Sequence, residues 1–198
     1  MKKIRFYRIK KEVRILGLDD GPFKRGDKEV IVVGTVFRGG NFIDGVLSTK
    51  ILVDGLDATK KVIELVNNCS FKDLRVIMLD GLGFGGFNLV DIKRVYKETG
   101  LPVIVVVRKK PDFKEIDKAL DNIDRKIERS RIIKNAGEPV KVETGKNKFI
   151  YMQCAGLDLE DAKKIIIISS TRSLIPEPIR VAHLIASGIV SGHSRGKA

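Results

Sequence analysis

The chain has 198 residues, two cysteines and a formal net charge of +13, from 38 basic and 25 acidic side chains. Its length suits one domain, residues 1–198, that buries a core without disulfides, and the lack of a long apolar segment excludes a membrane protein, so we expect a cytoplasmic one. The excess positive charge favours contact with nucleic acid, although charge-rich surfaces are also typical of heat-adapted proteins.

The first third of the chain predicts three strands. Arg14–Asp20 is an apolar run that ends in acids, and Lys28–Phe37 is rich in β-branched residues. Asn41–Asp54 follows a glycine-bearing turn that suits a hairpin. The connection at residues 20–28 is too short for the crossover helix that a doubly wound Rossmann sheet needs after its first strand. We therefore expect an antiparallel meander.

The middle of the chain predicts helices that alternate with buried strands. A helix over Asp57–Asn68, with Asp57 at its N-cap, precedes the apolar strand Leu74–Asp80. A glycine-rich loop leads to a helix over Asn88–Thr99 and to a second apolar strand, Leu101–Val107. Strand, helix, strand at this spacing predicts a parallel, right-handed crossover.

The last third predicts helices and one hairpin. Apolar residues repeat at steps of three and four over Phe113–Ile127, a hairpin is expected around Gly145–Asn147, and helices near Asp158–Ile168 and Glu177–Val190 finish the chain. The order of elements predicts a ribonuclease H-like α/β fold. It has a mixed five-stranded sheet of order 3-2-1-4-5 flanked by helices, with a C-terminal extension of helices and a hairpin.

Three predicted strands end in aspartate, at Asp19, Asp54 and Asp80. The first and fourth strands are expected to be parallel neighbours, which brings Asp19 and Asp80 together with Asp54 at the same edge. Crowded carboxylates repel one another unless a cation lies among them, and oxygen ligands favour Mg²⁺ or Mn²⁺, which activate water for phosphodiester hydrolysis. We predict all three as catalytic metal ligands, although each alone is a common turn former. Glu177 is the fourth predicted ligand, or else only favours the start of its helix.

Predicted nucleic-acid contacts follow two of these strands. The glycines of the loop after Asp80 let backbone approach a phosphate, or simply make a tight turn. They are Gly81, Gly83, Gly85 and Gly86. Phe84 is predicted to stack on a base or to anchor the loop in the core. Arg108 and Lys109 are predicted to hold a phosphate, or to form a solvated charge run. His183, among apolar residues, is assigned to the core or the helix surface.

The chain resembles endonuclease V, and more closely the archaeal endonuclease dU family. The resemblance is carried by ILGLDD with Asp19, STKILVD with Asp54, LDGLGFGGFN with Asp80, and GLPVIVVVRKKP. It implies an enzyme that nicks DNA near deaminated bases, with these aspartates as metal ligands and Arg108 or Lys109 as the phosphate contact. The chain departs from endonuclease V in several respects, and the later catalytic histidine of that family falls nearest Glu177 here. The chain lacks a histidine soon after Asp-Gly, and it has no clear counterpart of the proline-tyrosine wedge.

The predicted function is therefore a Mg²⁺-dependent endonuclease of DNA repair whose partner is DNA carrying damaged bases. The alternative is a module of the same fold that binds nucleic acid without cutting it and whose acids are structural. An enzyme of this kind stops on chelation of the metal, whereas a binding module has a salt-sensitive affinity that is indifferent to chelators.

Overall fold

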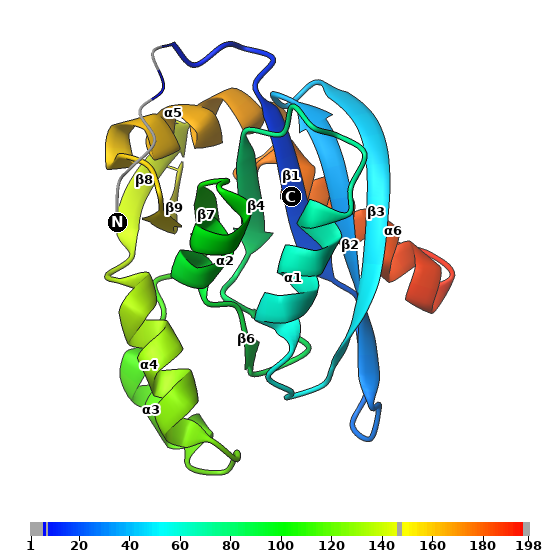
Figure 1. The fold of residues 1–198 in the computed structure, drawn as a ribbon, viewed down its shortest axis with the longest axis vertical. Coiled ribbons are helices and arrows are strands. Elements are labelled where there is room, and N and C mark those ends of the chain that lie inside the picture. The colour runs from blue at the N-terminus through cyan, green and yellow to red at the C-terminus, as the bar shows by residue number, and fades with distance from the viewer. Residues whose placement is uncertain (1–5, 7, 146–147, 196–198) are drawn as a thin grey trace.

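The computed structural model describes residues 6, 8–145 and 148–195. Within these residues, seven strands form one mixed sheet of order β3-β2-β1-β4-β7-β9-β8 (Figure 1). The strands are β1 Arg14–Asp20, β2 Glu29–Arg38, β3 Phe42–Leu52, β4 Val76–Asp80, β7 Val103–Val107, β8 Val140–Gly145 and β9 Lys148–Ala155. β1 pairs antiparallel with β2 and parallel with β4, and β4 pairs parallel with β7.

The predicted order 3-2-1-4-5 is confirmed for the first five strands of this sheet, with β7 as the fifth. The difference lies in the hairpin of β8 and β9, which extends the sheet instead of standing apart from it, because β9 pairs antiparallel with the free edge of β7. An apolar strand buried on both faces cannot leave its backbone groups unpaired at an edge. Lys146 and Asn147, at the expected hairpin tip, lie outside the described residues.

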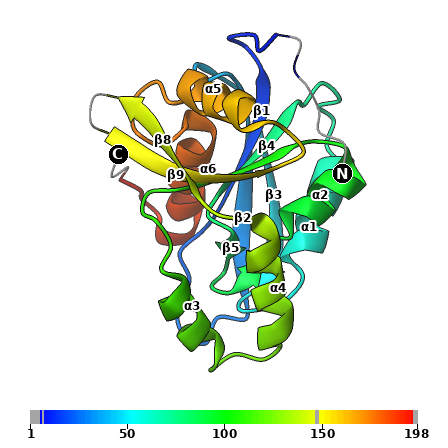
Figure 2. The same ribbon diagram turned by 90° about the vertical axis from the view of Figure 1, so that its left-hand side faces the viewer.

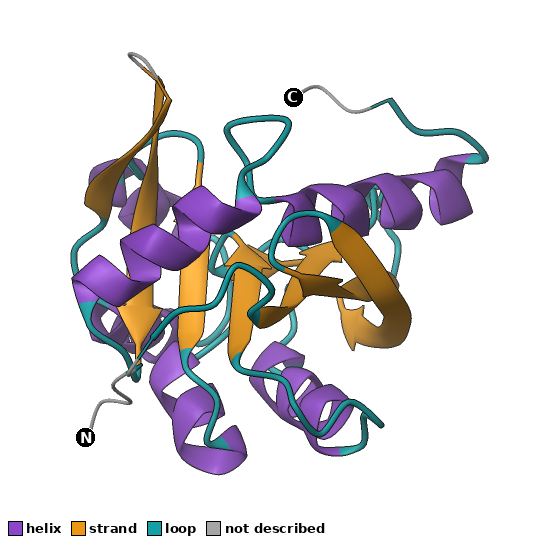
Figure 3. Ribbon diagram, turned by 90° about the horizontal axis from the view of Figure 1, so that it is seen from above, coloured by secondary structure: helices purple, strands orange, loops and turns teal. Residues whose placement is uncertain are grey.

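Helices cover both faces of the sheet (Figure 3). Helices α1 (Ala58–Asn67) and α2 (Ile92–Thr99) pack on one face, where Leu16 and Leu18 of β1 join their core. Helices α5 (Leu159–Ser169) and α6 (Glu177–Ser191) supply the core of the other face. No helix in the described part of the chain is both long enough and apolar enough to cross a bilayer.

Two predicted helices differ from their expected bounds. The helix expected from residue 88 begins only at Ile92, because Asn88–Leu89 forms the short strand β6 and Asp91 caps the helix by accepting from the N–H groups of Lys93 and Arg94. The helix predicted over residues 113–127 is divided into α3 (Phe113–Leu120) and α4 (Lys126–Ala136). The chain reverses there through a left-handed Arg125, with φ of +60°.

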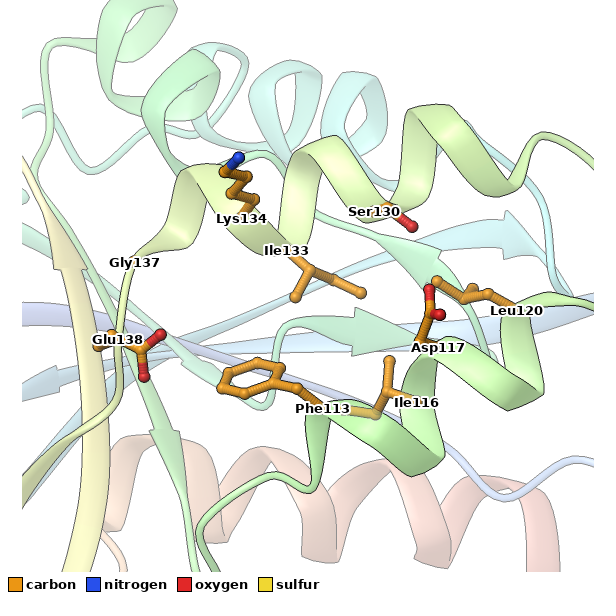
Figure 4. Close-up of a pocket in the computed structure, with 9 residues that line it drawn as sticks. All are labelled: Phe113, Ile116, Asp117, Leu120, Ser130, Ile133, Lys134, Gly137 and Glu138. Atoms are coloured by element: carbon orange, nitrogen blue, oxygen red, sulfur yellow. The ribbon is translucent and has the colours of Figure 1, made fainter.

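The α3–α4 hairpin projects beyond the sheet (Figures 1 and 2). The two helices flank an open pocket of about 430 Å³ (Figure 4). Four of the nine lining residues are apolar side chains of the two helices, namely Phe113, Ile116, Leu120 and Ile133. The apolar periodicity that suggested one long helix holds only for α3, because Ile127 of α4 is 88% exposed.

Candidate acidic site at the carboxyl ends of β1 and β4

The structure brings Asp19 and Asp80 together at one edge of the sheet. Leu18 of β1 pairs with Leu79 of β4 in parallel register, so the next residue of each strand lies beside the other. Adjacent strands are about 4.8 Å apart, and the negative charge of Asp80 contributes to the raised pKa of Asp19. Asp19 is buried, with 5% of its surface exposed.

Asp20 is a third carboxylate at this edge, and it points to the other face of the sheet because successive side chains of a strand alternate. Its Oδ2 accepts a hydrogen bond from the N–H of Gly85 at 2.7 Å. Its own N–H donates to Oδ1 of Asp19 at 2.9 Å. Asp20 therefore joins the glycine-rich loop to the acidic pair.

Helix α6 supplies His183, whose Nδ1–H donates to Oδ2 of Asp19 at 2.8 Å. The helix approaches β1 closely at Gly17, where an added Cβ would lie 2.4 Å from the carbonyl carbon of Pro178. The hydroxyl of Thr35 donates to the carbonyl of Pro178 at 2.6 Å and holds the start of the helix there. From Pro178 to His183 the helix advances by roughly 7 Å, and from Gly17 to Asp19 the strand advances by about the same distance. His183 therefore lies over Asp19.

His183 is the side chain at this site that sequence reasoning missed. Its side chain is 46% exposed, so the expected position on the helix surface is correct, but that surface faces the acidic site. Gly17, a glycine in the middle of an otherwise apolar strand, was the available signal, because a strand glycine often marks the close approach of another backbone.

The carboxyl groups of this site resist ionisation. Burial raises the pKa of Asp19 to about 7; the hydrogen bond from His183 opposes the shift, and the charges of Asp80 and Asp20 add to it. Burial also raises the pKa of Asp80 and of Asp20. The hydrogen bond to Asp19 raises the pKa of His183. Burial thus disfavours the charged form of all three carboxyl groups, and a bound cation would offset that effect.

The basic triplet after β7 lies beside this cluster. The positive charge of Arg108 opposes the rise in the pKa of Asp80, which is the effect of a nearby cation. Arg108 and Lys109 are both exposed. The expectation that they contact phosphate stays a prediction, and only Arg108 has an electrostatic link to the acids in the described structure.

Asp54 lies apart from the acidic pair. It occupies the turn after β3 with φ of +50°, and its Oδ1 accepts from the N–H of Phe87 at 2.8 Å. No hydrogen bond joins Asp54 to Asp19 or Asp80 among the described residues. β2 separates β3 from β1, as expected, so β3 lies two strand spacings, roughly 10 Å, from β1, and the role of Asp54 as a third metal ligand stays a prediction. Asp54 is linked to Asp20 through Gly85, whose carbonyl accepts from the N–H of Asp54.

Arg129 of α4 holds the turn of Asp54 against the glycine-rich loop. It is buried, with 2% of its surface exposed, and its guanidinium donates to backbone carbonyls instead of carboxylates. The acceptors are Asp54 at 2.6 Å, Gly55 at 2.9 Å, Asp124 at 3.0 Å, and Phe87. A buried arginine with backbone partners fixes the turn, the loop and α4 relative to one another.

The glycine-rich loop forms a small hairpin of β5 (Gly83–Phe84) and β6. Phe84 is fully buried, with 0% exposed, so it anchors the loop in the core and the expectation that it stacks on a base is wrong for this conformation. The N–H of Gly81 donates to Val106, and that of Gly85 to Asp20, so neither is free for a phosphate. Gly86 has φ of +83°, and an added Cβ would lie 2.3 Å from Oδ1 of Asp54. Contact of Gly83 and Gly86 with nucleic acid stays a prediction.

Glu177 does not join the acids. It is 3% exposed, and its carboxylate accepts two hydrogen bonds from Arg180, at 2.9 and 2.6 Å. The predicted metal role of Glu177 is therefore corrected. The last helix does reach the site, as expected, but through His183, which lies six residues further along it.

The chemistry of the donors fits a hard divalent cation. Carboxylate oxygens are the ligands that suit Mg²⁺ and Mn²⁺, and raised carboxyl pKa values are what such an ion relieves. Within residues 6, 8–145 and 148–195, no three His, Cys, Asp or Glu side chains form a group that could hold a metal ion. A carboxylate has about four lone-pair sites, so Asp19 keeps acceptor capacity beside its two hydrogen bonds.

Comparisons with known proteins find relatives that match nearly the whole chain. A UPF0215 protein of Methanothermobacter thermautotrophicus is 54% identical over 202 residues, which cover 100% of this chain and 98% of that protein. A solved protein of unknown function from Archaeoglobus fulgidus is 44% identical, with a TM-score of 0.81, and the match covers 89% of this chain and 97% of that one.

A more distant likeness shows the fold. Endonuclease V of Ciona intestinalis, solved in complex with DNA containing an inosine, is 20% identical with a TM-score of 0.54, and the match covers 85% of this chain and 82% of that one. The family model described as endonuclease dU matches residues 11–190, which is most of the chain. The protein therefore belongs to the endonuclease dU family and is a nuclease by family.

Proposed function

We propose that the protein is a divalent-metal-dependent endonuclease that hydrolyses a phosphodiester bond in DNA near a deaminated base. The observation that carries the proposal is the pair of buried Asp19 and partly buried Asp80, with His183 beside it, at the carboxyl ends of two parallel strands. Open α/β sheets bind their ligands at this edge. The net charge of +13 suits a polyanionic substrate, and a related fold binds inosine-containing DNA in the Ciona enzyme.

In this proposal Asp19 and Asp80 hold the cation, with Asp20 and the turn of Asp54 supporting them. A bound divalent ion supplies a more acidic water and stabilises charge on the leaving oxygen. His183 has one ring nitrogen on Asp19 and a raised pKa. It can therefore hold or deliver a proton at Nε2, on the part of the ring that does not contact Asp19.

The neighbouring basic side chains position the substrate. Arg108 lies close enough to Asp80 to affect its pKa and is exposed. A guanidinium offers two parallel donors to a phosphate, so Arg108 is the preferred contact for the scissile or adjacent phosphate, with Lys109 next to it. Asp20 and Arg129 keep the glycine-rich loop in place while the substrate binds.

The test is an incision assay on duplexes that carry uracil or hypoxanthine, with Mg²⁺ and with a chelator. We expect nicking near the modified base, no nicking of the undamaged duplex, and complete loss of nicking on chelation. Asp80→Asn is the matched variant, because it removes the charge and keeps the shape; it should bind the duplex without cutting it. Undiminished cutting by Asp80→Asn, or in the chelator, would contradict the proposal.

One observation favours the alternative of a binding module. Both oxygens of Asp19 already accept hydrogen bonds, from Asp20 and His183, and no three-residue ligand group exists among the described residues. A module of this kind would bind duplex DNA with an affinity that falls with salt and does not change on chelation, and it would leave every modified duplex uncut.

A further inference from the structure

A second charged cavity, of about 510 Å³, lies at the opposite edge of the sheet from Asp19 and Asp80. Arg14 begins β1 and pairs in register with Arg38 at the end of β2, while Arg75 immediately precedes β4. In Figure 1 the dark-blue segment that precedes β1 crosses this end of the sheet. Five cationic side chains line the cavity, namely Arg8, Lys10, Arg14, Arg38 and Arg75.

Two of these cations are engaged inside the protein. Arg14 contacts Asp73 at 2.6 Å and Asp44 at 2.8 Å, and its side chain is only 20% exposed. Arg38 contacts the same Asp44 at 2.8 Å. This network joins the ends of β1 and β2 to the segment before β4. It forms a fixed wall of the cavity, since both arginines share one carboxylate.

The other three cations are available to a ligand. Arg8 and Lys10 are exposed, and no side-chain hydrogen bond or ion pair links either of them to another described residue. Arg75 lies over the ring of Phe6, 5.4 Å from the centroid, a contact that orients the guanidinium and leaves its N–H groups to hydrogen-bond elsewhere. The residues that line the cavity include five cations but only two carboxylates, Glu12 and Asp73.

We propose that this cavity binds the phosphate groups of a nucleic-acid backbone at a site separate from the acidic cluster. Guanidinium groups match phosphate oxygens in pairs, and a concave surface with excess positive charge concentrates such anions. Six residue steps along β1, from Arg14 to Asp20, span roughly 20 Å. A segment held at the acidic edge therefore does not fill this cavity, which takes a second stretch of backbone. The inference is independent of the proposed function, because it needs no metal and no cleavage.

The experiment compares two triple variants of the full chain. Arg8→Gln, Lys10→Gln and Arg75→Gln together remove the three available cations and keep the network of Arg14 and Arg38. The matched control removes three exposed lysines that lie outside both sites, with the changes Lys97→Gln, Lys141→Gln and Lys148→Gln. Both variants lose the same charge, so a general electrostatic effect would weaken both equally. Equal melting temperatures show that both are folded.

Binding is measured to an undamaged duplex and, separately, to inorganic triphosphate, over a range of salt concentrations. We expect the cavity variant to bind the duplex roughly tenfold more weakly, with a shallower salt dependence by up to about 0.9 for each lost phosphate contact, while the control stays close to the parent. Loss of triphosphate binding by the cavity variant with unchanged duplex binding would identify a free oligophosphate as the ligand of the same site. If the two variants bind both ligands equally well, the proposal is wrong.

Discussion

The charge of Asp19 should destabilise the folded protein, and Asp19→Asn should relieve that cost. Burial raises the pKa of Asp19 from 3.8 to about 7, so between these values the folded state binds a proton that the unfolded state releases. The stability that this group contributes in acid is lost as the pH rises through about 7. Three units of pKa correspond to about 4 kcal/mol, an upper limit for the gain in Asp19→Asn.

Chemical denaturation in the presence of a chelator measures this effect. Near pH 3, below the pKa of Asp19 in both the unfolded and the folded state, both side chains are mostly neutral, and the variant should nearly match the parent in its free energy of unfolding. At about pH 8 we expect the variant to be more stable by roughly 2–4 kcal/mol, because the amide keeps the shape and can accept from His183 without a charge. Asp124→Asn, at an exposed position, is the control and should show no such change with pH.

The same experiment with Mg²⁺ separates the two functions considered. If the carboxylate holds a cation, added Mg²⁺ stabilises the parent at about pH 8 in proportion to its binding, and the variant gains less. A variant that is equally stable or less stable than the parent at every pH would refute the reasoning, because the carboxylate would then be fully compensated by its neighbours.

Three further substitutions test the surroundings of the site. His183→Gln should lower the incision rate roughly 100-fold and abolish one limb of its pH profile, since a glutamine cannot take up or deliver a proton; an unchanged profile would rule out proton transfer by His183. Arg129→Met should cost roughly 4 kcal/mol of unfolding free energy, because four backbone carbonyls lose their buried donor; a cost below about 1 kcal/mol by urea denaturation would show that water replaces it. Glu177→Gln should lower stability by about 3 kcal/mol through its pair with Arg180 and leave the incision rate unchanged; loss of incision without loss of stability would restore its predicted metal role.

The sequence by itself determined the order of the central strands and the meeting of Asp19 with Asp80. Both follow from local signals: uninterrupted apolar runs mark buried strands, short connections require antiparallel pairs, and a helical crossover requires a parallel one. Once β1 and β4 are parallel neighbours, residues that end these two strands must share an edge. The resemblance to the endonuclease dU family agreed with this and was confirmed by the match to residues 11–190.

The tertiary structure alone decided which other side chains face that edge. His183 reaches Asp19 because Gly17 lets α6 approach the strand, a contact between residues far apart in the chain. Asp54 also ends a strand, but the hydrogen bonds that hold its turn come from the glycine-rich loop and from α4. A periodic pattern in the sequence shows only which residues are apolar and how they are spaced along the chain. The direction of a helix face or of a turn depends on distant segments that pack against it, and those contacts exist only in the folded chain.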